Sequence, residues 1–402
     1  MSSVQEQPVQ VVFTGTRAEL AGMLLRGYAL LIPTIGLYRF WLATWKRRFY
    51  WANTEIDGDP LEYTGNAIQL LLGFLMALAV FVPLYGLFFY LSTQSSEAAI
   101  AGYSAVAVLL WFLMGYAIYR ARDFRLSRTL WRGIRCDQGG SAWGYALRRF
   151  FWSLLVLVTA GLAYPFMAAN LWAYRYRHSW YGDRQFGFVG SWKQLARPFY
   201  LAYVVIAIVG AVGLGAGSAM GGLPTGGVPT VEGVVVMVVA AALIGLMMLY
   251  YRSREISRMF SAVRLGQAAL TVTVRARGLL GQYLLFGLAL AGSYIVLAIG
   301  GLIVLGSLAS GAFVGGEFDP QLFMQALQDS MIVLLAIVFG YLLLLGAFSL
   351  MVELFLGLGF WKLVARGATI TGLDSLRTVR ARGEDTTLAG EGLADALNVG
   401  AY

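Results

Sequence analysis

The sequence predicts an all-α polytopic membrane protein with six transmembrane helices and two re-entrant or interfacial helical hairpins. Short cytoplasmic β-hairpins from internal repeats accompany them. Of the 402 residues 59% are hydrophobic and 13% charged, and the mean hydropathy is +0.69. A soluble domain carries roughly 25% charged residues, so this composition excludes ordinary soluble domains and disordered chains. In addition, long apolar runs alternate with short basic blocks, as is typical of polytopic membrane proteins.

Six apolar runs are long enough to cross a bilayer. A hydrocarbon core of ~30 Å needs about 20 apolar residues in a helix. None of the six runs contains Lys or Arg, so each is predicted to span. The runs are Ala67–Leu91, Ala98–Tyr119, Phe199–Met220, Val231–Tyr251, Leu279–Leu305 and Met331–Phe360.

Two further apolar runs, Leu20–Trp45 and Phe150–Tyr174, are interrupted by Gly and Pro near their middles. The three loops that join the spans in pairs, 92–97, 221–230 and 306–330, contain no Lys or Arg. If the interrupted runs enter and leave on one side, every basic block lies on the cytoplasmic side, as the positive-inside rule favours. We therefore expect two re-entrant hairpins that turn near Pro33–Gly36 and Gly161–Pro165, with both chain termini in the cytoplasm.

The two interrupted segments resemble each other and indicate an internal repeat. Each has a small-residue start, a Leu-Arg pair, an apolar stretch with a central Gly, and an aromatic-basic exit followed by a turn. Weaker echoes of the turn occur at 128–135, 264–274 and 370–380. Within them Thr271–Arg275 and Leu376–Arg380 alternate as half-buried strands do. We expect hairpins with Gly at their turns, pairing into a small cytoplasmic sheet beneath the helices. Such repeats either create a pseudo-symmetric body with a site or only enlarge a scaffold.

The repeat resembles that of a known family. F-T-G at Phe13–Gly15, G-L-Y-R-F-W at Gly36–Trp41, N-T-E-I-D-G at Asn53–Gly58 and E-Y-T-G at Glu62–Gly65 are similar to the repeat of the YjgN-like family, domain of unknown function 898. The later copies lack the N-T-x-x-x-G element. The resemblance implies a bacterial inner (plasma) membrane protein, and it implies no established activity and no catalytic residues.

These patterns divide the chain into seven segments. They are a flexible N-terminus (1–12), a first repeat (13–66), a transmembrane hairpin with an Arg-rich segment (67–140), a second repeat (141–198), a transmembrane hairpin with a cytoplasmic strand segment (199–278), a transmembrane hairpin (279–373) and a cytoplasmic tail (374–402).

Five charged residues are candidate lipid or substrate contacts: Arg26, Arg39, Arg148, Arg149 and Glu353. A guanidinium forms bidentate contacts with phosphate, so arginines on a broken helix suit an anionic headgroup. The alternative is that these arginines extend to the headgroup region without a specific ligand. Glu353 is the one acidic residue well inside a predicted span, either a proton or cation site or a carboxylate paired with an arginine.

The function favoured by these observations is non-enzymatic binding or transport of a lipid or small amphipathic molecule. The alternative is a structural or scaffold membrane protein that recruits a partner through its cytoplasmic face. With one His and one Cys, no catalytic constellation, cofactor or metal site is expected. The expected partners are membrane lipids, anionic headgroups among them, and no nucleic acid, because the basic residues lie beside apolar runs.

Overall fold

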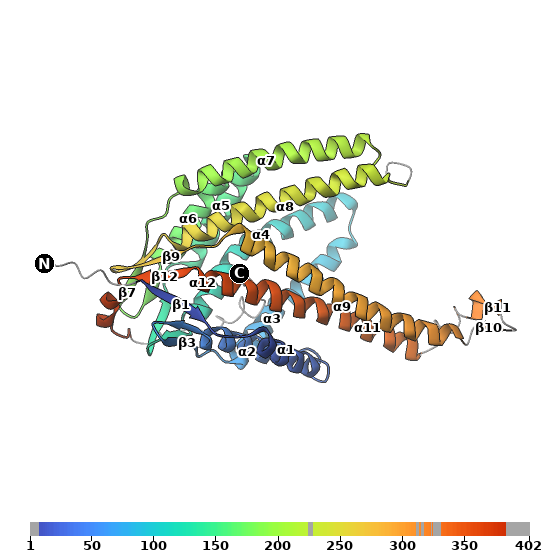
Figure 1. Cartoon of the computed structure of the whole chain (residues 1–402), viewed down its shortest axis with the longest axis horizontal. Helices are drawn as coiled ribbons and strands as arrows, with labels where there is room; N and C mark the ends of the chain where they lie inside the picture. The colour runs from blue at the N-terminus through green and yellow to red at the C-terminus, as the bar shows by residue number, and fades with distance from the viewer. Residues whose placement is uncertain are drawn as a thin grey trace. The chain divides into compact units, whose positions relative to one another are not determined.

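The computed structural model of the chain describes residues 8–223, 228–310, 313–314, 317–322, 324 and 331–382. They belong to two units, each compact by itself. The first comprises residues 1–15, 34–276 and 364–402, and the second comprises residues 16–33 and 277–363. Figure 1 shows the helices and strands of both units.

The first unit contains a closed barrel of ten short antiparallel strands. Four β-hairpins and one pair of terminal strands form the barrel. Strands of neighbouring hairpins pair with one another, so no free edge remains. In chain order the strands are β1 (Val9–Phe13), β2 (Thr54–Ile56), β3 (Asp59–Tyr63), β4 (Thr129–Trp131), β5 (Ile134–Gln138), β6 (Ser179–Tyr181), β7 (Arg184–Phe188), β8 (Val263–Leu265), β9 (Ala268–Val272) and β12 (Ala368–Thr371).

The closed barrel corrects the expectation of an all-α protein. The repeats are expected to give isolated hairpins or a small sheet, and the hairpins do form, but they close into a ring that is a structural layer in its own right. Each strand is only three to five residues long, too short to give a strong alternating pattern. The backbone partners come from the next repeat, 40 or more residues away, a distance that a local sequence pattern does not span.

The fifth member of the ring is built from both ends of the chain. Val9 of β1 pairs with Ile370 of β12, and Gln10 pairs with Thr369. Both strands are antiparallel, as are the two strands of the first hairpin, where Ile56 pairs with Asp59. β1 begins at Val9, inside the segment for which the sequence predicts a flexible N-terminus. In the other four members of the ring, both strands come from one β-hairpin. In the fifth member, β12 has no hairpin partner of its own and pairs with the N-terminal strand β1 instead.

Glycines at the hairpin turns adopt backbone angles that favour this residue. Gly58 has φ +81°, Gly133 has φ +71°, and Gly182 and Gly266 have φ +52° and +58°. Positive φ is required in the two-residue turns whose twist matches paired strands, and Gly adopts it without a Cβ clash. The predicted role of Gly in these turns is confirmed.

A repeated hydrogen bond connects each of three helices to the strand that follows it. Thr54 donates its hydroxyl to the Tyr50 carbonyl at 2.7 Å, and Ser179 donates to the Arg175 carbonyl at 2.8 Å. Thr129 does the same with the carbonyl four residues earlier. Each hydroxyl satisfies a carbonyl that the end of the helix leaves without an intrahelical partner. The helix and its hairpin are therefore joined in the same way in three repeats.

The barrel interior is filled by side chains and by a segment after β12. Trp131, Tyr181, Leu265 and Ala268 form its buried core. Residues Leu373–Thr378 form a 3₁₀ helix, and Leu373, Leu376 and Val379 pack into that core. The strand expected over Leu376–Arg380 is therefore wrong. Its apolar residues recur every third position, which suits a 3₁₀ helix with three residues per turn.

Long and short helices of the first unit alternate around the barrel. The long helices α3 (Ala67–Ser92), α4 (Ser96–Leu126), α7 (Trp192–Ala219) and α8 (Val231–Phe260) have 26 to 31 residues. The short helices are α2 (Arg39–Ala52), α5 (Ala142–Val158) and α6 (Tyr164–Arg177). In Figure 1, α7 and α8 run side by side and extend beyond α5 and α6.

The predicted breaks in the two interrupted segments are confirmed. α1 (Arg17–Leu31) ends before a turn in which Ile35 and Gly36 both have positive φ, and α5 ends before a turn in which Ala160 and Gly161 do. Two tyrosines of α7 cover the second turn: Tyr203 donates its hydroxyl to the Ala160 carbonyl at 2.8 Å, and Tyr200 donates to the Leu162 carbonyl at 3.0 Å. Side chains of α7 thus satisfy two backbone carbonyls of this turn.

The second unit comprises α1, α9 (Ala276–Ser310), α11 (Met331–Met351), a π-helical segment (Val352–Gly357) and α12 (Leu358–Arg366). A two-stranded sheet, β10 (Phe313–Val314) with β11 (Glu317–Phe318), lies in the loop after α9. Arg17 donates to the Leu354 carbonyl of the π-helical segment at 3.3 Å and to Gln282 Oε1 at 3.1 Å. A π-helical turn breaks the regular i to i−4 pattern, and Arg17 satisfies a carbonyl there.

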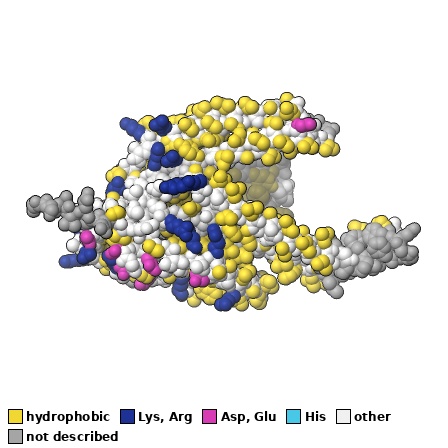
Figure 2. All heavy atoms as spheres, viewed as in Figure 1, with side chains coloured by type: hydrophobic (Ala, Val, Ile, Leu, Met, Phe, Trp, Pro, Cys, Tyr) yellow, Lys and Arg dark blue, Asp and Glu magenta, His cyan; other side chains and the backbone are white. Residues whose placement is uncertain are grey.

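Six helices of the described chain are long and apolar enough to cross a membrane. They are Ala67–Ser92, Ser96–Leu126, Trp192–Ala219, Val231–Phe260, Ala276–Ile303 and Val338–Arg366, and they correspond to the six predicted spans. In the first unit the arginines of α4 and α8 lie in the ends that join the barrel. Figure 2 shows the far half of the α7–α8 hairpin as mainly hydrophobic.

Candidate functional site

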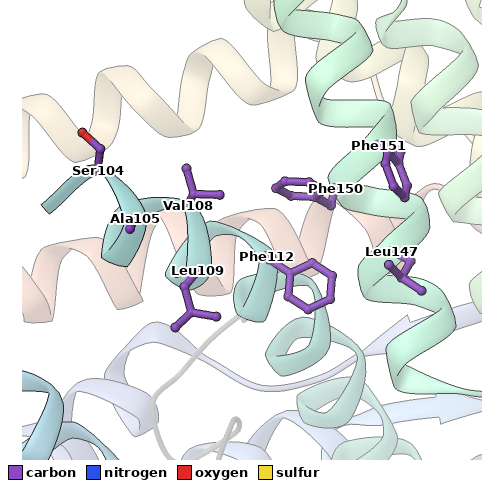
Figure 3. A pocket seen from close by; sticks show the side chains of 8 residues that line it. All are labelled: Ser104, Ala105, Val108, Leu109, Phe112, Leu147, Phe150 and Phe151. Atoms are coloured by element: carbon purple, nitrogen blue, oxygen red, sulfur yellow. The ribbon is translucent and has the colours of Figure 1, made fainter. Parts of the chain in front are cut away.

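The difference in length between α4 and α5 leaves part of α4 uncovered. α4 has 31 residues and α5 has 17. A groove of about 610 Å³ lies at this place (Figure 3), in the volume range of roughly 300–1,000 Å³ that ligand sites occupy. Its lining is almost wholly apolar. The lining residues are Ser104, Ala105, Val108, Leu109 and Phe112 of α4 and Leu147, Phe150 and Phe151 of α5.

Aromatic contacts fix the end of the groove nearer the barrel. The ring centroids of Phe112 and Phe150 are 5.7 Å apart in an edge-to-face arrangement, and Trp111 contacts Phe150 at 5.2 Å. Trp143 stacks on Phe112 at 6.0 Å. Edge-to-face and offset ring pairs are favourable packing geometries. They hold α5 against α4 below the groove, while Val108 and Phe151 stay about half and two-thirds exposed.

Arg148 and Arg149 are neighbours in the sequence but lie on different faces of α5. Arg148 is exposed, and its guanidinium lies 5.1 Å from the centre of the Tyr174 ring. It precedes Phe151 by three residues, so the two share one face of the helix. Arg149 points about 200° around the helix from Leu147, because successive residues differ by about 100°. Its stem packs at Gly115 of α4, away from the groove.

The other predicted arginines lie outside the groove. Arg26 on α1 is exposed, and among the described residues it has no hydrogen bond or ion pair. Arg39, at the start of α2, is exposed as well, with its guanidinium 5.7 Å from the Phe74 ring centre. Neither Arg26 nor Arg39 is among the residues that line the groove.

Glu353 is buried in the π-helical segment of the second unit, with 8% of its surface exposed. Tyr28 of α1 hydrogen-bonds Ser349, one turn before it, at 2.8 Å. The π-helical geometry at this position is a feature that hydropathy does not reveal. Such turns recur at functional sites, so Glu353 remains a candidate in the second unit.

Arg122 of α4 is an important residue that is absent from the candidates predicted from the sequence. It donates to Gln138 of β5, to Ser179 Oγ at 2.9 Å and to the Arg175 carbonyl at 3.4 Å. It thereby connects α4, α6 and two strands of different hairpins. A signal existed, because Arg47 and Arg122 both lie seven residues before a strand threonine, Thr54 and Thr129, and Arg47 likewise bonds Tyr63 of its own hairpin.

Glu255 of α8 is a second residue that is absent from the candidates predicted from the sequence. Its carboxylate is buried, with 3% of the residue exposed. Arg252 bonds it at 3.3 Å, and the Tyr164 hydroxyl lies 3.4 Å away. The predicted span Val231–Tyr251 ends before Glu255, whereas α8 continues to Phe260. Among the residues that the structure describes, no group of three or more His, Cys, Asp or Glu is placed to hold a metal ion.

Comparisons with known proteins place the chain in a family without giving it an activity. No curated protein and no solved structure matches the chain. One family model does match, over residues 8–396, which includes all ten barrel strands and every helix described above. The chain therefore belongs to the family described as bacterial protein of unknown function, DUF898.

Proposed function

We propose that this protein binds an anionic membrane lipid, with one hydrocarbon chain in the groove between α4 and α5 and the phosphate at Arg148. The observation that carries the proposal is the apolar groove of about 610 Å³ with an exposed arginine on the same face of α5. Arg148 lies one helical turn nearer the barrel than Phe151. Because helical side chains tilt toward the N-terminus, its guanidinium extends toward the barrel end, where a headgroup belongs.

Charge supports the choice of leaflet. Arg120, Arg122 and Arg125 lie at the barrel end of α4, and Arg252, Arg254 and Arg258 lie at that of α8. By the positive-inside rule this end faces the cytoplasm, in a bacterial inner membrane, and the lipid belongs to the cytoplasmic leaflet. Anionic headgroups of that leaflet attract basic residues near its surface.

The orientation has its own test. Since β1 and β12 pair in one barrel, both ends of the described chain lie on one side. Reporter fusions before residue 8 and after residue 402 should both be active only as cytoplasmic reporters. Periplasmic activity at either end would contradict the orientation and with it the leaflet.

Photo-crosslinking tests the lipid site directly. Phosphatidylglycerol with a photoreactive group in its acyl chain should label peptides from 104–112 and 147–151 above all other helices. Ala105→Trp should abolish this labelling by filling the groove, whereas Val238→Trp, on the exposed face of α8, should not. Labelling spread evenly over all helices, unchanged by Ala105→Trp, would refute the site and favour the scaffold function.

The role of Arg148 needs a matched control. Arg148→Gln should reduce labelling by anionic phosphatidylglycerol about tenfold, while leaving labelling by neutral phosphatidylcholine unchanged. The matched control is Arg254 of α8, an exposed arginine whose guanidinium lies 5.5 Å from the centre of the Tyr250 ring, as that of Arg148 lies near Tyr174. Arg254→Gln therefore removes one positive charge and one arginine–tyrosine contact away from the groove. An equal effect of the two substitutions would mean that only net charge matters.

A further inference from the structure

Arg149 is a partly buried cation without an acceptor. Its Nε–H is fully buried and has no hydrogen-bond partner. Among the residues that the structure describes, no carboxylate, carbonyl or aromatic ring contacts its guanidinium. A buried charged side chain is costly unless it is paired and hydrogen-bonded. The buried Nε–H of Arg149 therefore has no hydrogen-bond acceptor in the described structure.

Arg122 shows how the same fold satisfies an arginine when the partner is internal. Arg149 packs at Gly115 of α4, and Arg122 follows Gly115 by about two turns on the same helix. Arg122 has three hydrogen-bond acceptors and the Tyr176 ring at 4.9 Å. The contrast makes Arg149 a candidate for an external ligand.

A second unpartnered polar group lies at the same level. Ser153 of α5 contacts Met167 of α6 at 3.9 Å, and Arg148 lies over Tyr174. These two contacts fix the antiparallel register of α5 and α6, and they place Asn170 within about one helical turn of Arg149. Asn170 Oδ1 is buried without a hydrogen-bond partner.

We propose that Arg149 and Asn170 form a binding site for a phosphate-class oxyanion in the α4–α5–α6 junction. The guanidinium offers parallel N–H groups that match two phosphate oxygens. The Asn170 amide offers its NH₂ to the same ligand after a half-turn about its last bond, which exchanges nitrogen and oxygen. The ligand is either free inorganic phosphate or a lipid phosphate. The site lies on a different face of α5 from the groove, so it does not rest on the proposed function.

Thermal unfolding in a neutral detergent tests the proposal. At equal ionic strength, inorganic phosphate should raise the melting temperature of the wild-type protein above its value in chloride, because a ligand that binds the folded state stabilises it. Phosphatidic acid added to the micelles is the second arm. A shift with phosphate alone identifies the free anion, and a shift with phosphatidic acid alone identifies the lipid.

Substitutions separate a ligand site from a structural role. Arg149→Gln should abolish the shift and, in phosphate-free buffer, melt at or above the wild-type temperature, because it removes a cation that lacks an acceptor. Arg254→Gln, which removes an exposed arginine of α8 outside both proposed sites, should keep the shift. Arg122→Gln should lower melting in every buffer, because it breaks internal hydrogen bonds.

Binding measured by equilibrium dialysis with labelled phosphate or labelled lipid provides a readout that does not depend on melting. The affinity for phosphate or lipid should fall about tenfold in Arg149→Lys, which keeps the positive charge but loses the parallel N–H donors of the guanidinium. A similar fall is expected in Asn170→Leu. The proposal is overturned if neither phosphate nor phosphatidic acid shifts the wild-type melting temperature. It is also overturned if Arg149→Gln destabilises the phosphate-free protein as much as Arg122→Gln does.

Discussion

At the scale of single residues, the inside of the barrel determines the chemistry of Cys136. This cysteine lies on β5 and packs beside the barrel core of Trp131 and Tyr181. Burial raises the pKa of the Cys136 thiol to about 12, although the charge of Arg122 acts in the opposite direction. Since the thiolate is the reactive form, we expect the half-buried Cys136, the single cysteine of the sequence, to react slowly at neutral pH.

We predict that maleimide does not label Cys136 in the folded protein at pH 8, where on the order of one thiol in ten thousand is ionised. Labelling should accelerate about tenfold for each pH unit, without a plateau below pH 11, because the folded pKa lies above that range. Unfolding in SDS should restore rapid labelling. A Gln94→Cys variant, labelled in its exposed loop, is the positive control, and a plateau near pH 9 would contradict the prediction.

At the scale of elements, glycines bring α7 and α8 into close contact. A Cβ on Gly213 would collide with Ala240, and one on Gly217 would collide with Met237. The spacing of small residues in the sequence predicts close helix packing at Gly213, Gly217 and Gly221, and also at Gly311 and Gly315. The structure confirms it at Gly213 and Gly217. Gly221 instead lies in the turn with φ +75°, while Gly311 and Gly315, for which the same packing is expected, lie outside the described residues. Small residues let membrane helices approach and gain dispersion contacts.

Gly213→Leu should lower the free energy of unfolding by about 1–3 kcal/mol, because the larger side chain forces the two helices apart. Gly215→Leu is the matched control: the position is exposed, a Cβ there would meet no atom within 4 Å, and Leu favours a helix more than Gly does. Urea or SDS unfolding followed by far-UV circular dichroism measures both. Equal losses in the two variants would show that helix contact is not the cause.

At the scale of the whole barrel, a strap formed by residues 372–382 covers the turn side. Asp183 and Arg380 exchange hydrogen bonds, with the Asp183 N–H donating to the Arg380 carbonyl at 3.0 Å and the Arg380 N–H donating to the Asp183 carboxylate at 3.2 Å. The Arg382 guanidinium lies 4.8 Å from the Trp180 ring centre. A Cβ on Gly182 would collide with the Arg380 carbonyl, so this glycine permits the strap to lie close.

Gly182→Ala should displace the strap and make trypsin cleave faster after Arg377, Arg380 and Arg382. Gly58→Ala introduces the same left-handed strain at another hairpin turn, where a Cβ would meet no atom within 4 Å, so it should leave the cleavage rate unchanged. Limited proteolysis with mass spectrometry gives both rates. Similar acceleration in the two variants would mean that turn strain, and not the strap, controls access.

Much of this architecture could be predicted from the sequence because its signals are local. The six long apolar helices, the breaks at Gly36 and Gly161 and the glycine turns each depend on a few adjacent residues. Barrel closure depends on pairing between repeats, such as Cys136 with Tyr181, which no single segment encodes. The different roles of Arg148 and Arg149 depend on which helix each meets, and the groove depends on the relative lengths of α4 and α5, which hydropathy does not specify.

The pairing of β1 with β12 also orders the events of synthesis. Among the barrel strands β1 is synthesised first. One of its neighbours, β2, follows within about 50 residues, but its other neighbour, β12, emerges more than 350 residues later. Because domains generally form from the N-terminus during translation, nine of the ten barrel strands can assemble as an open sheet while Val9–Phe13 presents an unsatisfied edge. Exposed edges recruit foreign strands. The nascent protein therefore has an interval of vulnerability to aggregation that ends only when the final strand docks, and any truncation before residue 368 would make that interval permanent.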